Sequence, residues 1–191
     1  MDEKTICVYS SSSDAVAEHY FSAARDLGKC MGQRNYTLVY GGGDIGLMGE
    51  LARSVHRYGG NVVGVIPEFF NLPGIVYENP DQLIITETMR ERKAIMEERS
   101  DAFIGLPGGF GTLEEMLEII TLKQIQAHDK PVVFLNTGDF YRHLIDLFER
   151  LYREQFAKTE HRQLYFVAPD AQTALSYIET YKPPQLPKKW F

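Results

Sequence analysis

The residues best suited to chemistry lie in the run DAFIGLPGGFGTLEEMLE, from Asp101 to Glu118. An apolar stretch at 102–106 is long enough for a buried strand, and a proline and three glycines at 107–111 interrupt it. A helical pattern begins at Thr112, and its apolar face carries Leu113, Met116, Leu117 and Ile120. A strand, a glycine loop and a helix start together favour a bound phosphate, because glycines allow close backbone approach and the first helical N–H groups are free.

Thr112 and Glu115 allow a second interpretation. Thr-x-x-Glu is the spacing of a capping box, in which Thr112 accepts from the N–H of residue 115 and Glu115 reaches back to the helix start. Spacing alone leaves a capping role and a ligand role equally open. A capping box does not need three glycines in front of it, so the glycines tilt the interpretation towards a phosphate.

Two further turns follow predicted strands and could also hold a phosphate. Four serines at 10–13 precede Asp14, although a solvated turn with one capping serine explains them at least as well. The second turn has glycines at 41, 43 and 46 in the pattern G-x-G-x-x-G, with Glu68 placed as in a dinucleotide-binding fingerprint. That match is weak, because it opens the second strand–helix unit instead of the first. The candidate ligand contacts in these turns are Ser12, Gly42 and Gly43.

A predicted helix at 88–100 carries most of the basic residues near these turns. Its charges are mainly typical of a solvated face with i,i+4 ion pairs. Charges near the helix start are the exception, because in a parallel α/β sheet that end lies over the ligand crevice. The residues that meet this condition are Arg90, Glu91 and Arg92.

Seven strand-like runs alternate with helical patterns. The strands are predicted at 5–9, 37–40, 61–66, 83–86, 102–106, 130–135 and 164–167, and helices fill most of the intervals, including 139–154 and 170–181. This alternation predicts a doubly wound, Rossmann-like parallel α/β sheet with helices on both faces, in a single domain over 1–181. A long loop at 67–81 suggests a lid or an interface segment. The proline-broken tail at 182–191 ends in Trp190 and Phe191, which we expect to dock on this or a neighbouring subunit.

The composition limits the partners. The chain has 191 residues, 44% of them hydrophobic, and a net charge of −6. This charge argues against nucleic acid or an anionic membrane as the main partner, and no apolar run approaches the ~18 residues of a membrane span. Cys7 and Cys30 lie in apolar surroundings, and the five histidines show no metal-ligand spacing. We therefore expect a cytoplasmic protein with a small-molecule substrate and no metal or other cofactor.

Five segments occur in the order of one known family: YGGGDIGLMG at 40–49, GGNVVGVIP at 59–67, MRERKAIM at 89–96, DAFIGLPGGFGTLEE at 101–115 and HDKPVVFLN at 128–136. Together they resemble the Lonely Guy family, the cytokinin riboside 5′-monophosphate phosphoribohydrolases, earlier labelled lysine decarboxylases. The resemblance covers nearly all of residues 5–180. Its PGGxGTxxE motif, here at 107–115, is highly specific in this context.

The resemblance implies hydrolysis of the N-glycosidic bond of a nucleoside 5′-monophosphate to the free base and ribose 5-phosphate. It implies a catalytic pair, Arg92 and Glu115, with Met89 on the base side, in a homodimer. It also implies a phosphate cradle formed by Gly108, Gly109, Gly111 and Thr112. Bond cleavage leaves an oxocarbenium-like sugar, which an anionic Glu115 would stabilise. Arg92 would hold the phosphate and keep Glu115 ionised.

The chain departs from the family pattern in three places. Ser10 and Ser11 replace a cysteine and a glycine, Arg90 replaces a histidine, and Leu122 follows Thr121 where the family has a tryptophan. These changes bear on the preferred base, which for a relative of the bacterial type would be adenine in AMP. Two other classes stay open: a non-catalytic carrier of a nucleotide or a molybdenum-type cofactor on the same fold, and an NAD-dependent oxidoreductase. Retention of both catalytic candidates favours the hydrolase.

Overall fold

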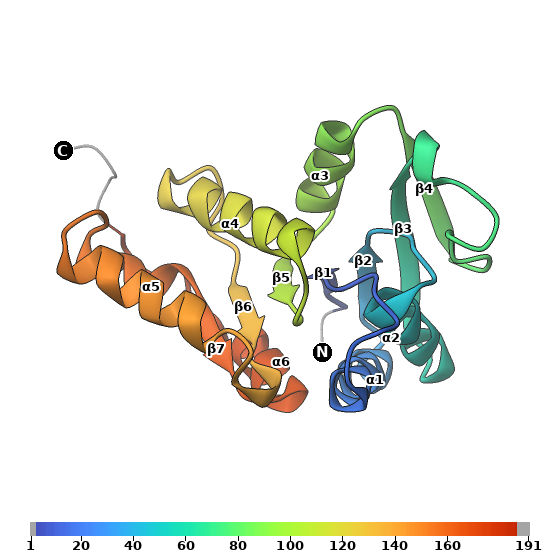
Figure 1. Cartoon of the computed structure of the whole chain (residues 1–191), viewed down its shortest axis with the longest axis horizontal. Coiled ribbons are helices and arrows are strands. Elements are labelled where there is room, and N and C mark those ends of the chain that lie inside the picture. The colour runs from blue at the N-terminus through green and yellow to red at the C-terminus, as the bar shows by residue number, and fades with distance from the viewer. Residues whose placement is uncertain (1–2, 187–191) are drawn as a thin grey trace.

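The computed structural model describes residues 3–186. Their strands form one seven-stranded sheet, and helices cover both of its faces (Figure 1). The strands pair in the order β4-β3-β2-β1-β5-β6-β7, and every pair is parallel. The strands are β1 (Thr5–Tyr9), β2 (Thr37–Tyr40), β3 (Asn61–Pro67), β4 (Gln82–Thr86), β5 (Ala102–Gly105), β6 (Val132–Leu135) and β7 (Phe166–Ala168). The α-helices are α1 (Glu18–Gly32), α2 (Gly46–Arg57), α3 (Met89–Glu98), α4 (Phe110–Gln124), α5 (Arg142–Arg153) and α6 (Ala171–Thr180). The predicted doubly wound α/β fold is confirmed.

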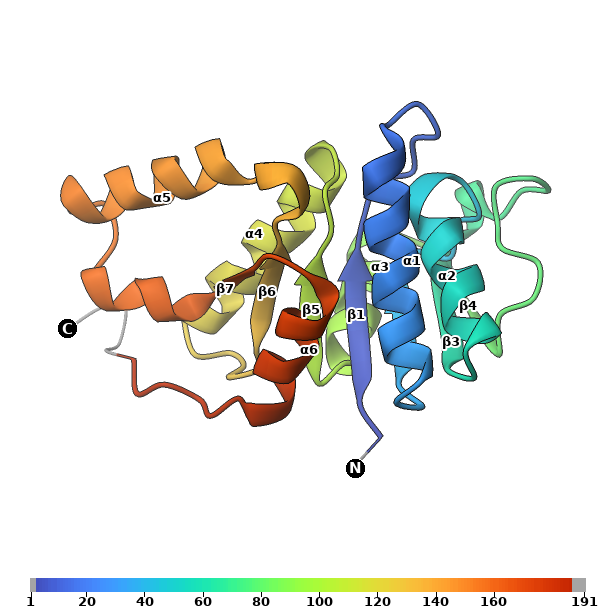
Figure 2. The ribbon, with the colours of Figure 1, turned by 90° about the horizontal axis from the view of Figure 1, so that it is seen from below.

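Two hydrophobic clusters, one on each face of the sheet, join the helices to the strands. Helices α1, α2 and α6 supply the first cluster, and α3, α4 and α5 supply the second (Figure 2). Side chains of β1 alternate between them, because successive residues of a strand point to opposite faces. Ile6 and Val8 enter the first cluster, whereas Cys7 and Tyr9 enter the second. The continuous apolar run TICVY is thus typical of a central strand buried on both faces.

The serine turn after β1 does not cap the helix that follows it, contrary to the prediction. Helix α1 begins only at Glu18, and no side chain in the described part of the chain caps it. Instead, the Asp14 carboxylate accepts from the Gly46 N–H at 2.8 Å, and the Ser11 carbonyl accepts from the Leu47 N–H at 3.0 Å. The turn therefore caps α2, because the pairing of β1 with β2 brings the two turns side by side.

Two other predicted boundaries shift for local reasons. Strand β7 begins at Phe166 instead of 164, because Thr159–Leu164 forms a 3-10 helix. Helix α5 begins at Arg142 instead of 139, because Gly138 and Asp139 both have positive φ, at 61° and 60°. The predicted cap of α6 is confirmed, since Asp170 accepts from the Thr173 N–H at 2.8 Å.

The long loop at 67–81 lies across the glycine turn that follows β2. The Asp44 N–H donates to the Ile75 carbonyl at 2.8 Å, and the Tyr77 N–H donates to the Gly42 carbonyl at 2.9 Å. These two hydrogen bonds hold the loop over residues 42–44, and we call the loop at 67–81 the strap. Its role as a lid or an interface segment stays a prediction.

Beyond α6 the chain continues as an extended tail, described as far as Leu186. Trp190 and Phe191, which we expect to dock on this or a neighbouring subunit, lie outside the described residues. Within 3–186, no helix is both long and apolar enough to cross a membrane.

Candidate active site

Arg92 and Glu115 form a buried ion pair between α3 and α4. Arg92 Nη1 donates to Glu115 Oε1 at 2.7 Å, and Arg92 Nε donates to the Val65 carbonyl at 3.0 Å. Each of the two charged residues exposes only 8% of its surface. Because the guanidinium is planar, the bonds to β3 and α4 together fix its orientation. The two side chains predicted to be catalytic are thus in direct contact.

The start of α3 explains why Arg92 turns inward while its neighbours do not. Thr88 caps the helix by accepting from the Glu91 N–H at 3.1 Å, and the Glu91 carboxylate accepts from the Glu87 N–H at 2.8 Å. This reciprocal arrangement holds Glu91 at the exposed helix end. Arg90 is also exposed, so only Arg92 of the three predicted charges reaches the crevice.

Gly41, at the end of β2, makes room for the guanidinium. A Cβ at this position would lie 2.2 Å from Arg92 Nη2, far inside contact distance. Any larger residue would displace Arg92 from Glu115. Sequence reasoning treated Gly41 only as part of a dinucleotide fingerprint and missed this role, although a glycine directly after a strand was the available signal.

Burial dominates the electrostatics of the pair. It raises the pKa of Glu115 above 4.5, and the opposing effect of Arg92 does not fully offset it. Arg92 therefore favours the ionised carboxylate, as expected, but its effect on the pKa is smaller than that of burial. Beneath the pair, burial also raises the pKa of the Cys7 thiol to about 12, and that of the Tyr9 hydroxyl well above its usual 10.0. Both groups are therefore neutral at ordinary pH, and Glu115 is the ionisable acid at this position.

The glycine loop leads into α4 without a side-chain cap. The cap position is Gly109, so Thr112 lies inside the first turn and not at its start. Thr112 is 3% exposed and packs on Gly108, where a Cβ would lie 2.2 Å from Thr112 Oγ1. Glu115 binds Arg92 instead of reaching back along the helix. The capping-box interpretation is therefore wrong, and no side chain among residues 3–186 caps the first N–H groups of α4.

A cavity of about 250 Å³ opens beside this loop, between the ends of β1 and β5. The strand order reverses at this point, which is where doubly wound sheets bind ligands. Gly108 and Gly109 form one wall of the cavity, Ser11 and Leu47 another, and Phe140 contributes a ring. The cavity therefore adjoins the uncapped start of α4.

The G-x-G-x-x-G turn does not offer a comparable anion site. Its Gly46 N–H is already bonded to Asp14, and the next N–H is bonded to Ser11. Gly42 and Gly43 are buried, and the strap crosses them through the bridge between Gly43 and Val76. A dinucleotide pyrophosphate would need those N–H groups free, so the arrangement disfavours the oxidoreductase alternative.

The inward face of α4 differs from the predicted apolar stripe. Its buried residues are Thr112, Glu115, Met116, Ile119 and Lys123, whereas Leu117 is 39% exposed. The helix is therefore rotated so that polar groups face inward at both ends. Apolar periodicity could not reveal this, because the buried polar residues do not belong to an apolar pattern.

The other predicted contacts lie nearer the surface. Ser12, Gly109 and Gly111 are exposed, and Met89, the first residue of α3, is 38% exposed. Lys93, which sequence reasoning assigned to a solvated face, instead ties α3 to α4. Its Nζ lies 2.8 Å from Glu118 Oε2 and also pairs with Glu114. Sequence reasoning therefore missed a contact between the two helices that carry the candidate pair.

Comparison with known proteins identifies relatives over most of the chain. The family model described as possible lysine decarboxylase matches residues 48–178. LOG5 of Arabidopsis thaliana, a cytokinin riboside 5′-monophosphate phosphoribohydrolase, is 42% identical over 180 residues, which cover 94% of this chain and 79% of LOG5. LOGL9 of Oryza sativa, a probable enzyme of the same name, is 41% identical over 94% of this chain and 79% of its own.

Solved structures share the fold at lower identity. The molybdenum cofactor binding protein of Rippkaea orientalis aligns with a TM-score of 0.72 and 20% identity, over 94% of this chain and 98% of that one. The molybdenum cofactor carrier protein of Chlamydomonas reinhardtii aligns with a TM-score of 0.72 and 25% identity, over 93% and 97%. The sequence identity of this chain to the phosphoribohydrolases, at 41–42%, is much higher than to these two molybdenum cofactor proteins, at 20–25%. The chain belongs to the Lonely Guy family, which the possible lysine decarboxylase model covers.

Proposed function

We propose that this chain hydrolyses the N-glycosidic bond of nucleoside 5′-monophosphates and releases the free base and ribose 5-phosphate. The names of its relatives at 41–43% identity support the reaction. The observation that carries the proposal is the buried ion pair in which Arg92 Nη1 lies 2.7 Å from Glu115 Oε1. Glu115 lies in α4, a helix that begins at a glycine loop without a side-chain cap.

The phosphate is assigned to the start of α4. Its uncapped N–H groups and the helix dipole attract an anion, and the exposed Gly109 and Gly111 let a phosphate approach the backbone. Gly108 and Thr112 pack together and shape the turn beneath it. Ser12 is a further candidate contact because its neighbour Ser11 lines the same cavity as Gly108 and Gly109. Gly42 and Gly43 are buried under the strap at 67–81 and would not contact the phosphate directly.

Glu115 is assigned to the reacting sugar carbon. As the C1′–N bond breaks, positive charge develops on the ribose, and a carboxylate in a buried site stabilises it strongly because little water screens the charge. The same carboxylate accepts a proton from the attacking water as the new C1′–O bond forms. The base leaves with the electron pair of the broken C1′–N bond and takes up one proton, so one water is consumed for each free base released. Arg92 orients Glu115 through their hydrogen bond, and we assign its remaining N–H groups to the phosphate or ribose.

The base is assigned to the exposed side of the crevice, near Met89. An exposed thioether offers contact area but no donor–acceptor pattern, so it accepts adenine with or without an N6 substituent. The departure at Arg90 places an exposed cation beside Met89. We therefore propose AMP and N6-substituted adenosine monophosphates as the substrate class.

A non-catalytic carrier is the second candidate, because two molybdenum cofactor proteins share the fold. Fold alone does not determine function. A buried ion pair costs desolvation free energy, and binding a cofactor without chemistry does not require a carboxylate held beside an arginine. The two functions differ in whether the bound nucleotide is recovered intact.

We also propose that the chain forms a homodimer in the cytoplasm. Phe110 is 93% exposed, and Phe69, Phe70 and Leu117 are 55%, 47% and 39% exposed, on elements that border the crevice. Such apolar residues favour a protein partner that covers them. The two free cysteines, Cys7 and Cys30, are compatible with a reducing compartment.

The test is a panel of nucleoside 5′-monophosphates that differ in the base, including AMP and N6-isopentenyl-AMP. Chromatography should show free base and ribose 5-phosphate in equal amounts, with the adenine nucleotides the best substrates. Recovery of every nucleotide intact, despite measurable binding, would instead support the carrier.

A further inference from the structure

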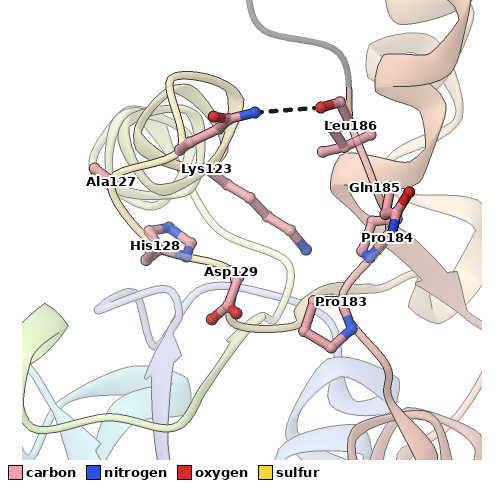
Figure 3. Close-up of a pocket in the computed structure, with 9 residues that line it drawn as sticks. Lys123, Ala127, His128, Asp129, Pro183, Pro184, Gln185 and Leu186 are labelled. Carbon is pink, nitrogen blue, oxygen red and sulfur yellow. Dashed lines mark hydrogen bonds between the residues drawn. The ribbon is translucent and has the colours of Figure 1, made fainter.

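A second cavity lies at the opposite end of α4 from the crevice. It has a volume of about 630 Å³ and opens where β6 is about to begin, between the α4–β6 connection and the C-terminal tail (Figure 3). Lys123 is eight residues beyond Glu115, which corresponds to ~12 Å along an α-helix. The cavity is therefore separate from the proposed active site.

Lys123 is the unusual residue of this cavity. It exposes only 2% of its surface, and its Nζ has no hydrogen-bond partner among residues 3–186. Figure 3 shows the side chain directed into the space between the turn at 127–129 and the tail. The ammonium lies 4.8 Å from the centre of the Tyr181 ring, a favourable cation–π contact that leaves its three N–H donors unused. Burying such a group without hydrogen bonds is costly, so the position calls for an acceptor.

The neighbouring polar groups are already engaged. His128 Nε2 lies 2.9 Å from the Ile119 carbonyl, and His128 Nδ1 accepts from the Lys130 N–H at 3.2 Å. The Gln126 amide donates to the Leu186 carbonyl at 3.2 Å, which ties the tail to the end of α4 (Figure 3). The histidine is neutral with these partners, and burial lowers its pKa. Lys123 thus supplies the positive charge of the cavity, and although Asp129 acts on it electrostatically, its ammonium has no hydrogen-bond acceptor among residues 3–186.

The rest of the lining restricts what could pair with it. Asp129 lies at the same turn, is exposed, and would repel a ligand with several negative charges. Ala127, Pro183, Pro184 and Leu186 add apolar surface. The volume exceeds that of a single inorganic ion and is in the range of small-molecule sites.

We propose that this cavity binds a small organic monoanion, a carboxylate on an apolar body, with the carboxylate on Lys123 and the body against the prolines of the tail. The carboxylate supplies the hydrogen-bond acceptors that the buried ammonium lacks. Binding needs a displacement of the tail, because the Lys123 Nζ is itself buried and a ligand in the cavity must reach it. The ligand therefore links the tail to the end of α4.

The test uses benzoate as the probe and benzamide as its uncharged counterpart, with the full chain. Burial lowers the pKa of Lys123 to about 8, so the titrations are run at a pH below that value. Calorimetry should give a dissociation constant for benzoate of about 1 mM or tighter. Lys123→Met, which keeps the length and removes the charge, should weaken benzoate binding by about tenfold or more. The matched control is Lys29→Met, an exposed lysine on α1, which should bind benzoate like the parent chain.

A second readout follows the lysine itself. In protein labelled with 13C at lysine Cε, benzoate should raise the pKa of Lys123, because a bound anion favours the ammonium. Asp129→Asn should tighten benzoate binding and should tighten inorganic phosphate binding more. The proposal is overturned if benzoate does not bind, if Lys123→Met binds it as well as the parent chain, or if phosphate binds the parent chain as tightly as benzoate. Lys123→Met should keep its AMP hydrolysis, so this result is independent of the proposed activity.

Discussion

Replacing Glu115 by glutamine separates charge from shape at the buried pair. Glutamine has the size of glutamate, and its amide oxygen can still accept the hydrogen bond that Arg92 Nη1 now makes at 2.7 Å. The substitution removes the negative charge that faces the developing cation. We expect turnover of AMP to fall by about 10²–10⁴, the range for an acid–base or electrostatic group.

The stability change can be worked from the same contacts. Burial raises the pKa of Glu115, which means that the ionised carboxylate is disfavoured there, and the amide relieves this penalty. Against this, Arg92 exchanges a charge-assisted hydrogen bond for a neutral one, a loss of ~1.5–3 kcal/mol for an ionic partner. Because burial outweighs the effect of Arg92 on that pKa, the two contributions roughly cancel, and Glu115→Gln should unfold within about 1 kcal/mol of the parent chain, or about 2–4 °C in Tm for a domain of this size.

The assay is the initial rate of adenine release, measured well below the melting temperature of either protein. Glu118→Gln is the matched control, because Glu118 lies on the same helix and pairs with Lys93 at 2.8 Å but is partly exposed. Its activity should stay within about threefold of the parent chain, since an exposed pair contributes little. If Glu115→Gln kept a comparable activity, the carboxylate would have only a structural role.

The pH profile gives an independent check on Glu115. Because its folded-state pKa is raised above 4.5, the carboxylate takes up its proton at a higher pH than an ordinary glutamate as the solution is acidified. The acid limb of kcat/KM should therefore lie above that value and should disappear in Glu115→Gln. Stability should change in the opposite direction to activity as the solution is acidified. Because the folded state binds this proton more tightly than the unfolded state, the contribution of Glu115 to the free energy of unfolding rises as the pH falls through its folded-state pKa.

Three further predictions concern the surroundings of the pair. Arg92→Lys keeps the positive charge but loses the planar guanidinium that binds both Val65 and Glu115, so turnover should fall by about tenfold or more. Arg99→Lys, at the exposed end of the same helix, should leave turnover nearly unchanged, and equal effects of the two substitutions would refute the role of Arg92. Gly41→Ala places a Cβ 2.2 Å from Arg92 Nη2, so it should lower turnover and reduce the free energy of unfolding by ~1–3 kcal/mol, measured by chemical denaturation. If neither turnover nor stability changed, the packing argument would be contradicted. Light scattering at micromolar concentration should give a mass of at least twice 21.8 kDa, and a monomer alone would refute the dimer.

Much of the architecture was predictable because its signals are local. The run AFIG at β5 is apolar throughout, as a central parallel strand requires, and the glycines after it mark the turn into α4. Asp170 was recognisable as a cap because its bond to Thr173 depends on four consecutive residues. Arg92 and Glu115 entered the candidate site through their position near helix starts and through the family motifs.

Other features depend on which turns become neighbours in space. Asp14 caps α2 across the sheet, and no pattern within residues 10–14 distinguishes that from capping α1. The Thr-x-x-Glu spacing at 112–115 fits a capping box, yet the helix starts earlier and Arg92 takes the glutamate. The role of Gly41 requires the path of the Arg92 side chain, 51 positions away, which no local pattern contains.

The most direct test of the account compares AMP with adenosine at equal concentration, with adenine release followed by chromatography. The uncapped amides at Gly109 to Thr112 gain their binding free energy only when an anion occupies them. AMP should therefore be cleaved to adenine and ribose 5-phosphate, while adenosine should react more slowly by a factor on the order of 10³. Equal rates would contradict the phosphate site at the start of α4, and no adenine from either compound would contradict the proposed hydrolysis.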